Sequence, residues 1–110
     1  MVVRERDEAE VDRLFHALAD TTRRDIVRRA MEHEQSVSEL ARRYPMSFAA
    51  VQKHVAVLQG AELVTKRRSG REQLVRSNVE TVRDACQLLE QIELVWRSRI
   101  DRLGEILAEH

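Results

Sequence analysis

Residues 36–60 read SVSELARRYPMSFAAVQKHVAVLQG and predict two short helices separated by a tight turn. Ser36 is followed three residues later by Glu39, a capping-box pattern that satisfies free amide donors at a helix start. Pro45 lacks an amide proton and disfavours helical geometry at the preceding residue, so it separates the two helices. Ser47 then provides the N-cap of the second helix. The spacing therefore predicts a helix-turn-helix.

The second helix of this stretch has two different faces. Val51, Val55 and Leu58 recur at i, i+4 and i+7, which predicts one buried face. The other side carries Phe48, Ala49, Gln52 and Lys53. A polar, basic outer face on such a helix suits the major groove of DNA. The alternative is a merely solvated face, because helix-turn-helix shapes are common in small helical proteins.

Length and composition limit the class of protein. The chain has 110 residues, of which 43% are hydrophobic and 35% charged, and we expect residues 1–110 to form a single domain with a modest core. The single cysteine, Cys86, excludes an internal disulfide and a multi-cysteine zinc site. No apolar run is long enough to span a membrane and no signal peptide is visible, so we expect a cytoplasmic location.

Charge is distributed unevenly along the chain, although the net formal charge is zero. Residues 42–76 contain eight basic and two acidic residues, a net charge of +6, and the remainder carries −6. The basic residues are Arg42, Arg43, Lys53, Lys66, Arg67, Arg68, Arg71 and Arg76. A clustered basic segment that coincides with the helix-turn-helix favours nucleic-acid binding more than the overall charge disfavours it.

The residues after the helix-turn-helix change from helical to strand-like spacing. Residues 63–65 and 73–76 form two short β-type runs, with a turn expected at Ser69 and Gly70. The basic residues near this turn are Arg67, Arg68 and Arg71. Because an isolated hairpin is marginally stable, we expect residues 63–76 to pack against the helices as a wing.

The chain before residue 36 predicts two amphipathic helices after a frayed polar lead-in over residues 1–8. The first helix, over residues 8–18, has an apolar stripe of Val11, Leu14, Phe15 and Leu18. Asp20 is the expected N-cap of the second helix, whose core face is Ile26, Val27, Ala30 and Met31. A polar turn is expected at residues 33–35.

A long last helix is predicted over residues 79–109, with Asn78 as its N-cap. Its apolar stripe is Val82, Ala85, Leu89, Ile92, Trp96, Ile100, Leu103 and Leu107. At about 1.5 Å per residue the helix is roughly 45 Å long, which exceeds a small domain with a radius of gyration of ~13 Å. We therefore expect a homodimer, unless the helix breaks and folds back on its own domain. The expected interface is Val11, Leu14, Phe15, Leu89, Ile92, Trp96, Ile100, Leu103 and Leu107.

The element order predicts a mainly α protein with a small β-hairpin, a winged helix-turn-helix with a long C-terminal dimerisation helix. Residues 18–27, LADTTRRDIV, closely resemble the LADPTRR.IL signature of the arsenical-repressor (ArsR) family of bacterial winged-helix regulators. Residues 37–41 and 47–58 resemble the helix-turn-helix of that family, and Leu63-Val64 and Gly70-Arg71 resemble its wing. The resemblance covers residues 11–76, and residues 96–103 resemble a metal-independent subgroup more loosely.

The resemblance implies a homodimeric repressor that binds an inverted-repeat operator in double-stranded DNA and leaves it on a signal. The implied DNA contacts are Ser47, Phe48, Ala49, Gln52, Lys53, His54, Arg67, Arg68 and Arg71. Ser47 suits a phosphate at the helix N-terminus, Gln52 a base edge, and Lys53 a guanine edge or a phosphate. His54 can equally face the core with one hydrogen bond, and both roles stay open.

The sequence departs from the family pattern at two turns. Thr21 replaces the usual proline after the capping aspartate, and Glu62 stands where the family turn has glycine. We expect the corner at Glu62 to be strained or reshaped, because glycine adopts positive φ without steric cost.

Metal sensing and cofactor binding are not expected. Metal-sensing family members carry paired cysteines where this chain has Glu39-Leu40-Ala41-Arg42. The four histidines, His16, His33, His54 and His110, form no cluster along the sequence. No metal ligands are therefore assigned.

Three other functions compete with DNA-binding regulation. An enzyme is disfavoured, since no nucleophile–base pairing, phosphate-binding glycine loop or paired-carboxylate site is visible. A winged helix that serves only protein–protein contacts would leave the basic face inert toward DNA. A metal- or redox-responsive repressor would use Cys86, although a lone cysteine in an amphipathic helix is usually a small core residue.

Overall fold

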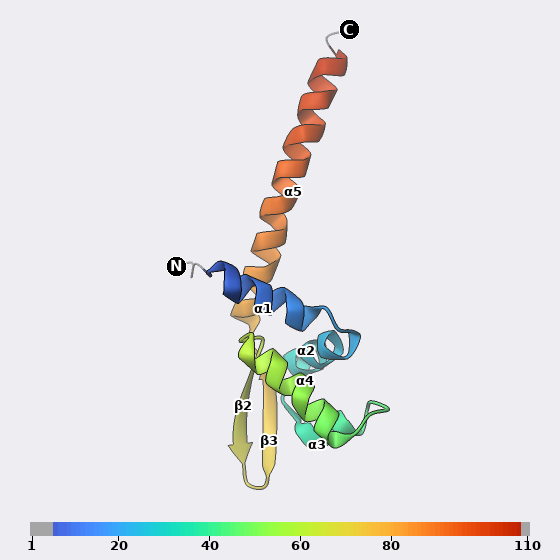
Figure 1. Cartoon of the computed structure of the whole chain (residues 1–110), viewed down its shortest axis with the longest axis vertical. Helices are drawn as coiled ribbons and strands as arrows, with labels where there is room; N and C mark the ends of the chain where they lie inside the picture. The colour runs from blue at the N-terminus through green and yellow to red at the C-terminus, as the bar shows by residue number, and fades with distance from the viewer. Residues whose placement is uncertain (1–5, 109–110) are drawn as a thin grey trace.

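The computed structural model describes residues 6–108. Its helices are α1 (Glu8–Leu18), α2 (Thr21–Glu32), α3 (Val37–Ala41), α4 (Phe48–Gly60) and α5 (Val79–Ala108). Its strands are β1 (Gln35–Ser36), β2 (Val64–Ser69) and β3 (Glu72–Ser77), which form an antiparallel sheet in the order β1-β3-β2. Figure 1 shows α1 to α4 and the sheet gathered at one end of the molecule, from which α5 projects. This is the predicted winged helix-turn-helix with a long last helix.

Side-chain caps explain where the helices begin. The predicted N-caps all accept a backbone amide: Asp20 from Arg23 at 3.0 Å, Ser36 from Glu39 at 3.0 Å, Ser47 from Ala50 at 3.1 Å and Asn78 from Glu80 at 3.2 Å. Each bond satisfies one of the amide donors that a helix start leaves without a partner in the helix. These four predictions are confirmed.

The core lies between the helices and the sheet. Its completely buried large side chains include Leu14, Ile26, Leu40, Leu58 and Leu63. Strand β3 packs against α2 and α3, and β2 packs against α4. Met31, which the spacing predicts in the core, is 44% exposed because it lies at the edge of the apolar stripe of α2. That prediction is wrong.

The polar turn predicted at residues 33–35 ends at Glu34, and a third strand begins at Gln35. Gln35 and Ser36 pair with Val75 and Leu74 of β3 and are almost completely buried. A two-residue strand has no recognisable local period, so only its distant partner defines it. The hairpin turn itself lies at Gly70 and Arg71, one residue later than predicted, since Ser69 pairs with Glu72.

The corner between α4 and β2 has the unusual backbone that the sequence predicts. Glu62 has φ of 61°. The amide of Glu62 donates to the carbonyl of Gln59 at 3.0 Å, and the amide of Leu63 donates to that of Leu58 at 3.0 Å. This is a Schellman motif, in which glycine usually takes the position of Glu62. The strain expected at this corner is therefore present, because an L-residue is disfavoured at positive φ.

Helix α5 divides into a packed base and an exposed distal part. Thr81 and Ala85 are buried, and Val82 and Leu88 pack against the core. Every residue in 89–108 is exposed. The radius of gyration is 18.6 Å and the longest dimension is 69 Å, so the molecule is much more extended than a domain of this length usually is. Within residues 6–108, no helix combines the length and the low charge needed to cross a membrane.

Arg6 attaches the start of the chain to the base of α5. Its side chain is only 6% exposed and donates from Nε to Asp84 Oδ2 at 3.0 Å and from Nη2 to Thr81 Oγ1 at 3.3 Å. It also lies 3.6 Å from carboxylate oxygens of Glu10 and Glu62. The frayed lead-in predicted for residues 1–8 is therefore wrong for Arg6 and for Asp7, the N-cap of α1. Residues 1–5, the predicted helix end at Glu109, and His110 lie outside the described residues.

Candidate nucleic-acid interface

The turn of the helix-turn-helix is fixed by a hydrogen-bonded carboxylate on α2. Asp25 Oδ2 accepts from the Tyr44 hydroxyl at 2.6 Å and from Arg29 Nε at 2.7 Å, and Arg28 donates to the other oxygen. The hydrogen bond from Tyr44, with those from the two arginines, holds the pKa of Asp25 well below its usual range. Burial, together with the Asp25 carboxylate, raises the pKa of Tyr44 to about 12. The position of α3 relative to α4 is therefore held through α2.

Helix α4 has one face in the core and one open to solvent. Val51, Val55 and Leu58 are at most 1% exposed, which confirms the predicted buried face. The predicted contact residues Ser47, Phe48, Ala49, Gln52 and Lys53 are all exposed. Ala56 shares the outward side, so small side chains flank Lys53 and let the helix backbone approach a groove closely. This is the face that the sequence assigns to DNA.

His54 lies on the flank of α4 that faces α2 and is partly buried. Its Nδ1 lies 3.2 Å from Nη1 of Arg23. Because a guanidinium can only donate, Nδ1 accepts, and the ring proton is on Nε2. Arg23 also donates to the carbonyls of Ala17 at 2.8 Å and His16 at 3.0 Å, so it joins the end of α1 to α4. Of the two roles left open by the sequence, this geometry favours the inward-facing, hydrogen-bonded one.

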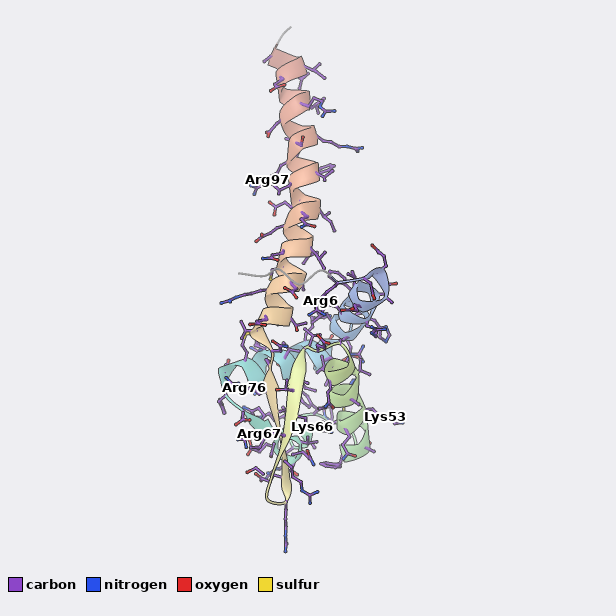
Figure 2. The ribbon with its side chains drawn as sticks, turned by 90° about the vertical axis from the view of Figure 1, so that its left-hand side faces the viewer. Arg6, Lys53, Lys66, Arg67, Arg76 and Arg97 are labelled. Atoms are coloured by element: carbon purple, nitrogen blue, oxygen red, sulfur yellow. The ribbon has the colours of Figure 1, made fainter. Side chains whose placement is uncertain are left out.

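The wing presents different basic residues on its two faces. Side chains alternate along β2, so Lys66 and Arg68 share a face with the buried Val64. Arg67 lies on the opposite face, where its Nε and Nη2 donate to both carboxylate oxygens of Glu34 at 2.8 Å. Figure 2 shows Arg67 and Lys53 on opposite sides of the hairpin, with Lys66 between them.

The pair between Arg67 and Glu34 changes the set of wing contacts drawn from the sequence. The two hydrogen bonds from Arg67 hold the pKa of Glu34 below its usual value, and the carboxylate raises the pKa of Arg67. Such a bidentate pair fixes the orientation of the guanidinium. Arg67 is thus engaged with an acidic residue 33 positions earlier, which lies outside the basic segment over residues 42–76. The positive charge available on the wing is smaller than the sequence suggests.

The remaining basic side chains of the interface are uncommitted. Arg68 and Arg71 are exposed near the hairpin turn, and Arg68 Nε donates only to the carbonyl of Gly70, at 3.2 Å. Among residues 6–108, no carboxylate forms an ion pair with Lys53, Lys66, Arg68 or Arg71. The N-terminal end of α4 and the turn of the wing lie at the same end of the molecule, opposite the free end of α5 (Figure 1). The arrangement can accept a polyanion at that end.

The residues predicted for the dimer interface fall into three environments. Leu89, Ile92, Trp96, Ile100, Leu103 and Leu107 are between 51% and 67% exposed on α5. Val11 and Phe15 on α1 are partly buried. Leu14 is completely buried in the core of its own chain, so its assignment to an interface between chains is a mistake. The helical period places Leu14 in the stripe of α1 but does not show which element covers it.

The described residues hold no cluster typical of a metal site. Within residues 6–108, no three His, Cys, Asp or Glu side chains are close enough together to hold one ion. Cys86 is exposed on α5, contrary to the small core residue that its amphipathic helix predicts.

The chain matches no protein-family model. It is 49% identical over 59 residues to the helix-turn-helix-type transcriptional regulator Rv2034 of Mycobacterium tuberculosis, a match that covers 54% of this chain and 55% of that protein. The matched part of the chain therefore spans about half the length of this curated relative.

Solved structures show similarity over nearly the whole chain. An ArsR-like transcriptional regulator from Rhodococcus sp. RHA1 is 33% identical, with 93% of this chain and 94% of that chain covered and a TM-score of 0.81. The homodimeric winged helix-turn-helix DNA-binding domain of Mb0332 from Mycobacterium bovis, described as a possible ArsR-family regulator, is 24% identical. That match covers 88% of this chain and 91% of the other with a TM-score of 0.61, and supports the fold alone.

Proposed function

Because the chain belongs to the ArsR family of winged helix-turn-helix transcriptional regulators, we propose that it is a homodimeric repressor that binds an inverted-repeat operator. The observation that carries the proposal is the exposed outer face of α4 beside the unpaired basic residues of the wing. In this proposal residues 1–110 act as one winged-helix domain. The cytoplasmic location expected from the sequence stays a prediction.

The proposed contacts divide between sequence discrimination and general affinity. Gln52 suits the edge of an adenine, and Lys53 suits a guanine edge or a phosphate. Ser47 and the free amides at the start of α4 suit a phosphate. The proposed affinity contacts on the wing are Lys66, Arg68 and Arg71. Arg67 is assigned a positioning role, since its pair with Glu34 joins the hairpin to the residue just before β1.

Self-association is proposed through the distal part of α5. Among the described residues, nothing of the same chain covers the stripe formed by Leu89, Ile92, Trp96, Ile100, Leu103 and Leu107. Val11 and Phe15 of α1 are proposed to contribute the exposed parts of their side chains. A two-fold symmetric dimer would place two α4 helices on half-sites about 34 Å apart, one turn of DNA.

In this proposal, release of the repressor from its operator does not depend on binding of a metal ion. Its support is the absence of paired cysteines in the sequence, which has one cysteine in all. Zinc, cadmium and arsenite at micromolar concentration are expected to leave operator binding unchanged in a gel-shift titration. Release by any of these ions that is abolished in Cys86→Ser would instead support a metal-responsive repressor.

Selection of bound sequences from a random duplex library tests the main proposal. We expect enrichment of an inverted repeat whose half-site centres are about one helical turn apart. Affinity for the enriched duplex should fall steeply with salt, with a slope of about 0.9 in log units for each phosphate contacted. Failure to enrich any duplex, or an affinity independent of salt, would favour a winged helix that serves protein–protein contacts only.

A further inference from the structure

We propose that Phe48 contacts the 5-methyl group of a thymine in each operator half-site and so makes that position specific for thymine. The inference rests on the proposed DNA-binding function and adds to it the identity of one base. Phe48 is the first residue of α4, directly after the N-cap Ser47. The N-terminal residues of a recognition helix are the ones that contact base edges.

The exposure of Phe48 is unusual for the part of the molecule that surrounds the core. Among residues 6–88, the large apolar side chains that are exposed are Met31, Phe48 and Val79. Phe48 is 47% exposed and lies on the helix that carries Gln52 and Lys53. A half-exposed phenyl ring gains free energy when another apolar group covers it. Within residues 89–108, the exposed large apolar residues lie on the part of α5 that projects away from this end (Figure 1).

On α4, Phe48 lies beside Gln52, the polar residue best suited to contact a base edge. Phe48 and Gln52 are four residues apart, so they are neighbours on one flank of the helix. Gln59 lies seven residues beyond Gln52 on the same flank, and it lines a shallow surface hollow with Thr65 and Lys66 of the wing. The flank of Phe48 and Gln52 therefore faces the wing, whereas His54 faces α2.

The chemistry of the major groove limits what a phenyl ring can recognise there. Each base pair presents hydrogen-bond donors and acceptors, and only thymine adds an apolar group, its 5-methyl. Phe48 has no polar atom in its side chain, so it cannot bind a phosphate or a donor. Next to it, Ala49 is small and exposed and does not block the ring. Gln52 suits adenine, so the two side chains together predict neighbouring A·T pairs.

Thymine-to-deoxyuridine substitution tests the inference, because it removes the methyl group and leaves base pairing unchanged. The probe is the duplex enriched by selection from random DNA, with each thymine of one half-site replaced in turn. For the wild-type chain we expect one replacement to weaken binding about fourfold, the loss expected when one buried methyl group is removed. Phe48→Ala should bind the thymine and deoxyuridine duplexes with equal affinity.

Two matched variants separate this contact from general effects. Phe48→Leu keeps an apolar side chain and should keep the preference for thymine. Met31→Ala removes a side chain of similar exposure from α2 and should behave as the wild type.

The outcomes also separate this inference from the proposed function. If no duplex is enriched, both are overturned. If a duplex is enriched but every deoxyuridine replacement is neutral, the contact to thymine is overturned and the proposed function stands. A thymine preference that persists in Phe48→Ala assigns the methyl contact to another residue, and it also overturns the inference.

Discussion

Most apolar side chains are buried or partly buried in the body of the molecule, residues 6–88, but those in the distal part of α5, residues 89–108, are exposed. In the body, Leu14, Ile26 and Leu58 are completely buried. In the distal part, every large apolar side chain is at least 50% exposed. Both parts have the same helical spacing of apolar residues. A helical stripe of apolar residues therefore predicts burial but does not show whether the covering surface belongs to the same chain.

The two parts of the molecule should be stabilised by different contacts. The core of the body is held by contacts within one chain, so the change in stability caused by a core substitution should be the same at every protein concentration. If a second copy covers the stripe, the fraction of dimer should rise with protein concentration, because association follows mass action. Fully burying a Leu or Ile side chain contributes roughly 1.5–3 kcal/mol relative to leaving it exposed, so covering this stripe with a second copy would favour association.

Ile100→Asp is the variant expected to have the largest effect. A charge within the stripe should yield a monomer, and operator affinity should fall about a hundredfold or more because two linked half-sites no longer act together. Sedimentation and operator titration measure the two effects. Leu94→Asp is the matched control, since Leu94 is 64% exposed on α5 but lies off the stripe. A dimer that survives Ile100→Asp would mean that the stripe is not the interface.

Tyr44→Phe tests the body. It removes a hydrogen bond to a charged carboxylate and should lower the free energy of unfolding by about 1.5–3 kcal/mol, independently of protein concentration. Because the pKa of Asp25 is lowered in the folded protein, its contribution is present above the ordinary carboxyl pKa of about 3.9 and is lost as pH falls. The difference between wild type and variant should therefore shrink in acid. Denaturant unfolding at several pH values measures it, and a difference that grows in acid would contradict it.

Gln52→Ala tests whether sequence discrimination belongs to the body alone. It should reduce the ratio of operator to random-DNA affinity about tenfold, within the range for a bidentate base contact, and leave the oligomeric state unchanged. Gln59→Ala provides the control, because it removes the same side chain near the other end of α4. Equal loss of affinity for operator and random DNA in Gln52→Ala would show that the base contact is elsewhere.

Arg68→Ala and Arg67→Ala distinguish the two faces of the wing. Arg68→Ala should weaken operator and random DNA by a similar few-fold factor and reduce the salt slope by about 0.9, one phosphate contact. Arg67→Ala should leave the salt slope nearly unchanged, because Glu34 already binds this guanidinium. Affinity measured at several salt concentrations provides the test. Equal changes of slope would mean that Arg67 leaves Glu34 for a phosphate on the operator.

Glu62→Gly is expected to have the smallest effect, and to be more stable than Glu62→Ala. Compared with Glu62→Ala, it should raise the free energy of unfolding by about 1 kcal/mol, because only glycine adopts this positive φ without steric cost. Both variants lose the carboxylate near Arg6, so their difference isolates the backbone. Thermal unfolding of the two variants provides the measurement. Equal stability would mean that the corner relaxes when the side chain is shortened.

Features that depend on neighbours within one or two helical turns could be predicted from the sequence. Ser36 and Ser47 define helix starts because a cap bonds to an amide three residues away. Val51, Val55 and Leu58 define a buried face because helical spacing places them together. The length and uninterrupted pattern of residues 79–108 predicted a helix that projects from the body. Local hydrogen bonding and helical geometry are sufficient for all of these.

Features that join residues far apart in the chain could not be predicted from the sequence and are defined by the folded structure. Glu34 removes Arg67 from the basic face, Arg23 holds His54 inward, and β3 makes a strand of residues 35 and 36. Leu14 belongs to the core rather than to an interface for the same kind of reason. Each of these depends on which distant surface the folded chain brings alongside. No local spacing encodes that surface, because its free energy arises only when the elements pack.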